Sequence, residues 1–490
     1  MAPTKSILLV PPLIKYSAGP LLGPALLQSA AKSRGHVCKV IDLNAQYIQP
    51  RVMPRLHLGK FVGDHDKPKA HGPCSLSAIE ERFLNKHILP ALDHTNHLDS
   101  DEMEKFRRRV LFGFLTHHQV EAAAISLADS GLGRWIQDII AKHTDPEKGG
   151  DSVGHPEVIG VSLLHSGQIL PAAAITQVAR QLWPEALVVW GGPHISGLGK
   201  AALERDIRFR AFAADVFVTG HAERTFLQVL DQVEVLKRET KSIPKVLTGE
   251  SGKVLSPVFD DLDIYDKPLT LPAQSTLGCA YGRCTYCTYP SIEGTPRKLD
   301  LLTAVGTVVD TAQCMGNDTS VSIKDSLVIA TRLSEIGDLI QGRVKWSACT
   351  KLSRRLDRQK LMQLSANGLA TLELGLESLL PQTQRRIDKM QPESRYHDFV
   401  RSVAEMDSDL SLVVNYMVGF PWENKEEAHA KLEEVRDFLM KNLGPDRGTI
   451  ELNTFELERL SAMARFPDAY GIDPFSIMTW PWASVLEVQS

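Results

Sequence analysis

The stretch Cys279-Ala-Tyr-Gly-Arg-Cys-Thr-Tyr-Cys287 places three of the chain's seven cysteines within nine residues, spaced C-x4-C-x2-C. A short apolar run and a glycine, Leu277 and Gly278, come directly before it. Thiolates at this density are metal ligands or disulfide partners far more often than chance neighbours. Disulfide frameworks are typical of small secreted chains, and this chain has 490 residues. The stretch therefore predicts a metal site.

The number of thiolates helps to decide which metal. A structural zinc site has four closed ligands, usually paired C-x2-C motifs or one such pair with two histidines. Only one C-x2-C pair occurs here, and no histidine lies between Val254 and Arg395. An iron–sulfur cube has four ligand positions, so Cys279, Cys284 and Cys287 would leave one iron open. The spacing favours an iron–sulfur cluster over zinc and over inert or redox thiols.

Length and composition describe an ordinary globular protein. A chain of 490 residues holds about three average domains or two large ones. The net charge of −4 gives no general attraction to nucleic acid or anionic membranes. The N-terminal apolar run is too short for a signal peptide, and no apolar run approaches the ~18 residues of a spanning helix. We expect a cytoplasmic protein without membrane contact.

Strand and helix patterns alternate in the first half of the chain. Buried-strand patterns occur at Ser6–Val10, His36–Asp42, Val158–Ser162, Ala186–Trp190 and Asp215–Thr219. An insertion interrupts them at about 46–154, with helical stretches at Ala78–Leu92, Asp101–Leu115 and Leu132–His143. Five strands with intervening helices predict a Rossmann-like, doubly wound α/β domain over 1–235.

The pattern resumes after a region expected to be a linker, 236–270. Strands are expected at Ser320–Ile323, Val344–Ala348, Ala370–Gly375, Leu412–Val418 and Thr449–Phe455. With the segment before Cys279, they make six βα units and predict a partial (β/α)6 TIM-type barrel over 271–460, followed by a tail over 461–490. The cysteines then occupy the loop after the first barrel strand, on the side where barrels carry their chemistry.

Small residues mark the strand ends of the first half: Gly160, Ser162, Gly191-Gly192-Pro193, and Gly220 with Glu223. Glycine at such a place lets the backbone approach a flat ligand or a phosphate. Turn glycines after strands are routine, so each motif alone is a weak signal, but together they indicate a cofactor-binding sheet. No G-x-G-x-x-G follows the first strand, which disfavours a dinucleotide.

Taken in order along the chain, these motifs resemble those of cobalamin-binding radical S-adenosylmethionine (SAM) enzymes. The matching residues are Val10-Pro-Pro with Gly19-Pro20, Ser162, Gly191-Gly-Pro193, Gly220-x-x-Glu223, the cysteine loop with Tyr286, Gly375-Leu-Glu-Ser378 and Met417-Val-Gly-Phe-Pro421. The resemblance implies an N-terminal Rossmann-like cobalamin-binding domain and a C-terminal radical SAM barrel with a [4Fe–4S] cluster.

Two features depart from the family pattern. The commonest cysteine spacing in the family is C-x3-C-x2-C, and the first gap here is one residue longer. The Asp-x-His-x-x-Gly signature that ligates cobalt in many cobalamin proteins is absent, so we do not expect the loop after the first strand to ligate cobalt. His165 and His194 lie near strand ends, where a plain polar contact is the simpler interpretation.

The resemblance also implies roles for single residues. Cys279, Cys284 and Cys287 would hold the cluster, and Tyr286 would lie beside it. Ser162, Gly191, Gly192, Pro193, Gly220 and Glu223 would contact cobalamin. Glu377 and Ser378 would contact SAM, although they could instead begin a helix at Pro381.

The implied function is methyl transfer to an unactivated carbon or phosphorus after reductive cleavage of SAM. A small-molecule or peptide substrate and an electron donor such as flavodoxin or ferredoxin would be the partners. Three alternatives stay open: a cyclase or ring-rearranging enzyme without methyl transfer, a methylthiotransferase-like modifier of RNA or protein, and an inactive cobalamin carrier or sensor. The second needs three further N-terminal cysteines, and only Cys38 and Cys74 are present. Basic residues between Lys351 and Lys360 lack interleaved aromatics, so nucleic acid is not the expected partner.

Overall fold

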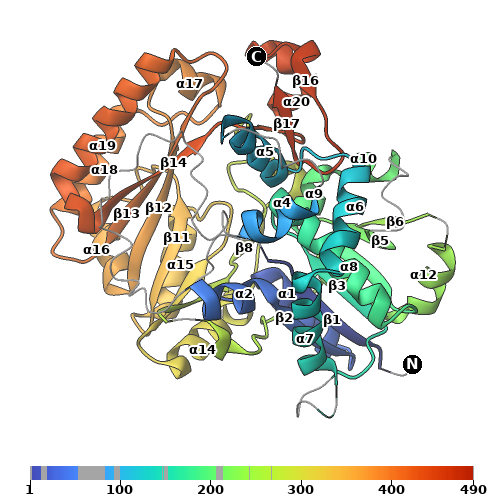
Figure 1. Cartoon of the computed structure of the whole chain (residues 1–490). Coiled ribbons are helices and arrows are strands. Elements are labelled where there is room, and N and C mark those ends of the chain that lie inside the picture. The colour runs from blue at the N-terminus through green and yellow to red at the C-terminus, as the bar shows by residue number, and fades with distance from the viewer. Residues whose placement is uncertain are drawn as a thin grey trace.

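The computed structural model describes residues 3–12, 19–52, 83–92, 100–145, 147, 153–205, 213–241, 243–265 and 267–488, without the side chains of 48–52, 100, 103 and 104. Its two large sheets each contain six parallel strands. Figure 1 shows them side by side, with the C-terminal segment, in red, at the top above the first sheet. The chain is therefore an α/β protein with two halves.

The first sheet has the strand order β2-β1-β3-β4-β5-β6. Its strands are β1 (Lys5–Val10), β2 (Val37–Asp42), β3 (Val158–Ser162), β4 (Leu187–Gly191), β5 (Val216–Thr219) and β6 (Lys245–Thr248). The helices of this half are α1 (Leu22–Ser33), α2 (Leu43–Val52), α4 (Leu89–Ala91), α5 (Ser100–Phe112), α6 (His117–Ala128), α7 (Gly131–Thr144), α8 (Ile169–Leu182), α9 (Pro193–Leu198), α10 (Lys200–Arg205), α11 (Glu223–Asp231) and α12 (Val233–Glu239).

Apolar residues on both faces of these strands explain the layered arrangement. Five of the six residues of β1 are buried, because helices cover both sides of a parallel sheet. Parallel pairing also aligns the strand ends: Ser162 of β3 is opposite Gly191 of β4. The small residues expected to bind a cofactor therefore lie along one edge of the sheet.

One part of the first half differs from the sequence-based expectation, and the structure adds detail to a second. β6 lies inside the range 236–270, expected to be a linker, and adds a sixth strand beside β5. The helices of the 46–154 region share a core with α8: Val120, Ala124 and Leu127 of α6 belong to the same buried cluster as Ala173 of α8. The expected helix 78–92 is described only from residue 83, where a π-helical turn precedes α4.

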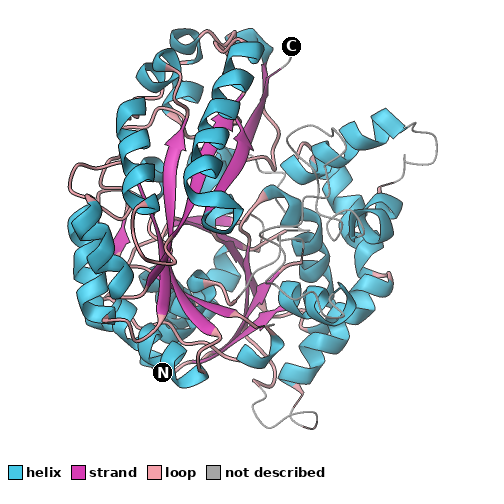
Figure 2. Cartoon of the chain, turned by 90° about the vertical axis from the view of Figure 1, so that its left-hand side faces the viewer, coloured by secondary structure: helices cyan, strands magenta, loops and turns pink. Residues whose placement is uncertain are grey.

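The second sheet has the order β14-β13-β12-β11-β10-β7, so β7 and β14 are its edges. Figure 2 shows its strands curving, with helices along the outer side. The strands are β7 (Leu269–Ala273), β10 (Thr319–Ile323), β11 (Lys345–Thr350), β12 (Leu369–Glu377), β13 (Ser411–Val418) and β14 (Gly448–Thr454). The helices are α13 (Tyr289–Glu293), α14 (Thr307–Met315), α15 (Ala330–Ile340), α16 (Arg358–Ala366), α17 (Pro381–Arg386), α18 (Glu393–Ala404) and α19 (Lys425–Arg447).

Alternation along the strands separates an apolar outer face from a polar inner face. In β13, Leu412, Val414 and Tyr416 are buried and belong to the core cluster beneath the helices. On the inner face, hydroxyl pairs link neighbouring strands at 3.0–3.1 Å: Thr270 with Ser320, Ser322 with Ser347, and Thr371 with Ser411. A polar interior suits a sheet that encloses a ligand.

The C-terminal segment joins the two halves. β15 (Leu457–Glu458), β16 (Ile477–Met478) and β17 (Val485–Val488) form a small antiparallel sheet, and α20 (Ala462–Arg465) lies between β15 and β16 in the chain. Trp482 is fully buried in the core of the first half, where its ring lies 6.0 Å from that of Trp190. Within the described residues, no helix combines the length and apolar character that a bilayer crossing requires.

Candidate active site

The cysteine loop begins at the carboxyl end of the short strand β8 (Thr276–Leu277), which pairs with β9 (Arg297–Lys298). Gly278 has φ +71°, and a Cβ there would lie 2.9 Å from the carbonyl oxygen of Gly294. A side chain at this position would therefore strain the entry to the loop. Cys279, Cys284 and Cys287 are half-buried and form no disulfides.

A buried ionic network anchors the residues just before the loop. The carboxylate of Asp325 accepts hydrogen bonds from the backbone N–H and the hydroxyl of Ser275, both at 2.6 Å. Arg332, which is 4% exposed, donates to the carbonyl oxygens of Ser275 and Leu299. Arg332 also pairs with Glu335 at 2.7 Å, so Asp325 and Arg332 hold Ser275 from two sides.

Burial favours the protonated form of two of the three thiols, Cys284 and Cys287. Burial raises the pKa of Cys284 and raises the pKa of Cys287 to about 12. Metal binding to these thiols would have to release protons. Among the described residues, no group of three His, Cys, Asp or Glu side chains is gathered as for one metal ion. A cube attaches each thiolate to a different iron, so its three thiolates do not have to converge on one ion.

Glu377 lies at the end of β12 in an uncommon backbone conformation. Its φ is +68°, and the register between β12 and β13 shifts at this point. Its Oε1 atom lies 3.2 Å from Nζ of Lys389, and each side chain is only 12% exposed. A Cβ on Gly375 would lie 3.0 Å from that oxygen and 3.2 Å from that nitrogen. Strain in a strand-end carboxylate is typical of a functional position.

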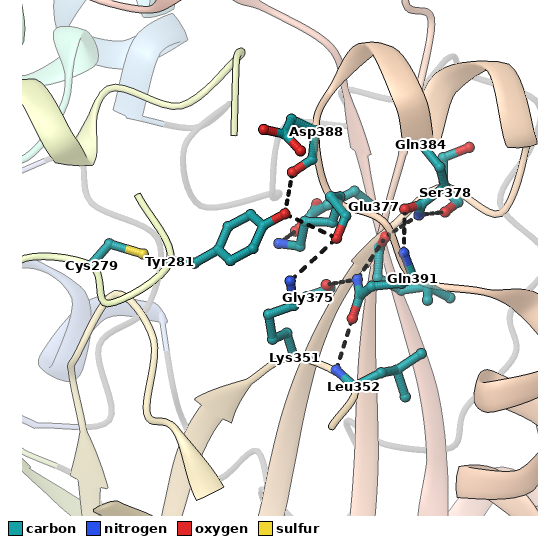
Figure 3. A network of polar contacts seen from close by, with 12 residues as sticks. Cys279, Tyr281, Lys351, Leu352, Gly375, Glu377, Ser378, Gln384, Asp388 and Gln391 are labelled. Carbon is teal, nitrogen blue, oxygen red and sulfur yellow. Dashed lines mark hydrogen bonds and ion pairs between the residues drawn. The ribbon is translucent and has the colours of Figure 1, made fainter. Parts of the chain in front are cut away.

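Glu377 also connects to the cysteine loop. Its carboxylate interacts with the hydroxyl of Tyr286, although burial is the main reason that the pKa of Tyr286 is raised. Figure 3 shows Glu377 at the strand end, with Tyr281 of the cysteine loop facing the same region. Thr285 donates from its hydroxyl to the carbonyl oxygen of Arg386, at 2.9 Å, which ties the loop to the segment before Lys389.

Ser378 has a local structural role. It is fully buried, and its hydroxyl accepts a hydrogen bond from the N–H of Leu380 at 3.2 Å, just before α17. Gln384 of α17 donates to the carbonyl oxygen of Ser378. The hydroxyl therefore helps to form the turn into the helix, which is the alternative weighed for this residue.

At the edge of the first sheet, Gly192 has φ +104° and a Cβ there would lie 2.4 Å from the carbonyl oxygen of Leu163. Pro193 then begins α9. Ser162, Gly191 and Gly220 lie along the same edge, and Glu223 is the first residue of α11. Within the described part of the chain, Oε2 of Glu223 and Nε2 of the neighbouring His221 are buried without a hydrogen-bond partner. Close backbone approach and unsatisfied polar atoms fit a large polar cofactor here.

The Nε2 atom of His194 contacts the protein itself and not an open ligand site. That atom lies 3.0 Å from the carbonyl oxygen of Trp482 in the C-terminal segment. Burial lowers the pKa of His194 to about 3. The expectation of a plain polar contact for this histidine therefore agrees with its surroundings.

The edges of the two sheets meet at the cysteine loop. A Cβ on Gly220 would lie 3.7 Å from the carbonyl oxygen of Ile292 in α13, the helix that follows Cys287. His221 acts electrostatically on Glu293 of the same helix, whose pKa burial raises. The glycine-marked edge and the thiols thus face a common region.

Sequence reasoning missed Lys389 and Cys349. Lys389 lies twelve residues from Glu377, so no local pattern links them. Cys349 is on the inner face of β11, opposite Glu373 of β12, and burial raises the pKa of its thiol to about 12. The two-residue alternation of β11 could have placed Cys349 on the inner face of the second sheet.

The sequence of the chain is related to that of a known enzyme over part of its length. No protein-family model matches the chain. It is 24% identical over 202 residues to tRNA-2-methylthio-N(6)-dimethylallyladenosine synthase of Saccharopolyspora erythraea, a match covering 37% of this chain and 40% of that protein. The chain thus spans less than half of this curated relative.

Two solved structures resemble nearly the whole chain. The radical SAM methyltransferase TsrM from Kitasatospora setae, solved with cobalamin and a [4Fe–4S] cluster, superposes with a TM-score of 0.57 at 14% identity, over 94% of this chain and 77% of TsrM. The cobalamin-dependent SAM radical enzyme OxsB, solved with aqua-cobalamin and SAM, does so with a TM-score of 0.57 at 13% identity, over 99% of this chain and 64% of OxsB. The chain therefore has the fold of cobalamin-dependent radical SAM enzymes.

Proposed function

We propose that the chain is a cobalamin-dependent radical SAM methyltransferase that acts on an unactivated carbon or phosphorus. The observation that carries the proposal is the meeting of three free thiols, the Glu377–Lys389 pair and the glycine-marked sheet edge in one region. A [4Fe–4S] cluster, when bound, supplies the electron that cleaves SAM, and cobalamin supplies a methyl carrier. The chain's own residues bind and orient these groups.

Cys279, Cys284 and Cys287 would hold the cluster and leave one iron without a protein ligand, which is the position for the amino and carboxylate groups of SAM. Glu377 and Tyr286 would lie beside that position and would orient SAM through their oxygen atoms. Lys389 fixes the Glu377 carboxylate at 3.2 Å. Gly375 keeps the space open, since a Cβ would crowd both partners.

The first sheet would hold the corrin ring by backbone approach. Gly191, Gly192 and Gly220 offer no side chain, while Ser162, Glu223 and His221 offer polar atoms at the same edge. The contact of Gly220 with α13 places this edge next to the cysteine loop, so that a methyl group could meet a substrate radical there. Pro193 rigidifies the turn into α9.

The test is anaerobic purification and reconstitution, followed by metal analysis, a visible spectrum and incubation with SAM under reducing conditions. We expect four irons and one cobalt per chain and release of 5′-deoxyadenosine. A product heavier by one methylene supports methyl transfer. An unchanged or oxidised mass supports the ring-rearranging alternative, and zinc in place of iron contradicts the whole assignment.

The match to a tRNA methylthio-modifying enzyme favours a second candidate, a methylthiotransferase. Such an enzyme needs a second cluster from N-terminal cysteines. Cys38 is buried in the core of the first half, and burial raises the pKa of its thiol to about 12. Cys74 lies outside the described residues. Four irons rather than eight per chain would exclude this candidate.

A further inference from the structure

The C-terminal segment contacts the cysteine loop on both sides of Cys287. The backbone N–H of Met463 donates to the carbonyl oxygen of Thr285 at 3.0 Å. The carboxylate of Glu458 accepts a hydrogen bond from the backbone N–H of Thr288 at 3.1 Å. Because one contact precedes Cys287 and the other follows it, the C-terminal segment holds this part of the loop at two points.

The part of the segment that makes these contacts is itself held in place. Met463 is fully buried, and Tyr286 of the cysteine loop packs against the same apolar cluster. On the other side, Nη1 of Arg459 donates to the carbonyl oxygen of Leu198 in α9, at 3.4 Å. The backbone position of Glu458, which directly precedes Arg459, is therefore set by contacts with both halves of the molecule.

The Glu458 carboxylate also acts on Cys287 through its charge. Burial raises the pKa of the Cys287 thiol to about 12, and Glu458 adds to this shift more than the other two thiols do. Burial raises the pKa of Glu458 as well, while the hydrogen bonds from Thr288 lower it. A hydrogen bond donated to a carboxylate favours its ionised form. Glu458 therefore brings a negative charge to the Cys287 end of the loop.

We propose that Glu458 is a positioning residue for the cluster. Its carboxylate fixes the backbone that follows Cys287 and places a negative charge beside this ligand, which lowers the reduction potential of the bound cluster. The inference rests on the proposed function, because it concerns the cluster that the three cysteines would hold. Reduction adds one electron, and a nearby negative charge opposes that addition. A lower potential makes the reduced cluster a stronger electron donor toward SAM.

The experiment measures the reduction potential of the cluster in the reconstituted holoenzyme. The protein is titrated with dithionite in the presence of redox mediators, and the reduced cluster is followed by low-temperature EPR. Glu458→Gln removes the charge but keeps an oxygen that accepts from the Thr288 N–H. Glu458→Ala removes both, and Glu458→Asp retains the charge. The matched control is Glu487→Gln in β17 of the same segment, where the carboxylate accepts from Nε1 of Trp480 at 2.7 Å.

We expect Glu458→Gln to keep its iron and to raise the ratio of reduced to oxidised cluster about tenfold at a given solution potential. For a one-electron couple this is a rise of about 59 mV in the reduction potential. Glu458→Ala should show the same rise and should also lose iron on gel filtration, because the backbone beside Cys287 loses its hydrogen bond. Glu458→Asp should return the potential toward that of the wild type, and Glu487→Gln should leave it unchanged.

An unchanged potential in Glu458→Gln overturns the inference, as does an equal shift in the Glu487→Gln control. A shift in Glu458→Asp as large as that in Glu458→Gln also overturns it, since the aspartate retains the charge. Loss of iron from Glu458→Gln to the level of Glu458→Ala does so too, since the glutamine retains the hydrogen bond. A wild-type chain that binds no reducible iron–sulfur cluster contradicts the proposed function instead.

Discussion

The two large sheets have the same number of strands and the same parallel pairing, but their carboxyl edges differ in chemistry. The edge of the first sheet presents Gly191, Gly192 and Gly220, which carry no side chain, and Gly192 and Gly220 have positive φ angles. The edge of the second presents thiols, a carboxylate and an ammonium group. One edge is suited to holding a large group by shape, and the other to holding a cluster and orienting its ligand.

The difference shows how two similar scaffolds can divide a reaction. A cofactor that performs its own chemistry needs a close-fitting surface, which glycines provide. Chemistry at a cluster needs ligand atoms in fixed positions. Side chains that are themselves held by a further hydrogen bond or ion pair provide such atoms. Substitutions at the first edge should therefore act through shape, and substitutions at the second through lost donors or charge pairs.

The largest effect is expected at the thiols of the second edge. Cys284→Ala removes one of the three proposed ligands, and the loop Cys279–Cys287 contains no further cysteine. The iron content after reconstitution should fall from about four atoms per chain to a small fraction of that amount. SAM cleavage should fall to background. Iron analysis and detection of 5′-deoxyadenosine measure both. Cys314→Ala removes an exposed cysteine of α14 and should leave both values unchanged.

The charge pair beside the thiols gives the next effect. Lys389→Met leaves the Glu377 carboxylate buried without its partner, which should lower the free energy of unfolding by about 3 kcal/mol. Lys431→Met is the control, because its pairs with Glu393 and Glu434 lie at the surface and should contribute below about 1 kcal/mol. Denaturant titration compares the two. Equal losses of unfolding free energy in the two variants would show that the buried Glu377 carboxylate does not need Lys389 as its ion-pair partner.

The first edge should respond to added volume. Gly192→Ala places a Cβ 2.4 Å from the carbonyl oxygen of Leu163 at a φ of +104°, so the turn must shift. We expect a loss of about 2 kcal/mol in stability and weaker cobalamin binding, measured by denaturation and by cobalt retained after gel filtration. Gly23→Ala in α1 meets no atom within 4 Å and should stabilise the chain slightly. Full cobalt retention in Gly192→Ala would contradict a shape-based site.

Much of this contrast could be predicted from the sequence, because it depends on local patterns. The parallel sheets follow from strand and helix alternation, and Cys279, Cys284 and Cys287 follow from their spacing. The sixth strand β6 was missed because Lys245–Thr248 is short and only partly buried. Lys389 was missed because it reaches Glu377 only through the turn after α17. Pairings set by tertiary structure leave no periodic signal in a single chain.

His194 gives the smallest expected effect and tests how firmly the C-terminal segment closes the first half. Burial lowers the pKa of His194 to about 3, against an ordinary value of 6.5 for an exposed histidine. Between these values the unfolded chain binds a proton that the folded chain excludes, so this residue lowers stability as the pH falls from 6.5 toward 3.

The variant His194→Gln retains a donor for the carbonyl oxygen of Trp482 but cannot bind the proton. Between pH 6 and pH 5, the wild type should lose about 1 kcal/mol more of its unfolding free energy than the variant does. Denaturant titrations at the two pH values measure the difference, with the exposed His118→Gln as the control. If the two proteins lose stability in parallel, water or a proton reaches His194 in the folded chain, and Trp482 does not seal this side of the sheet.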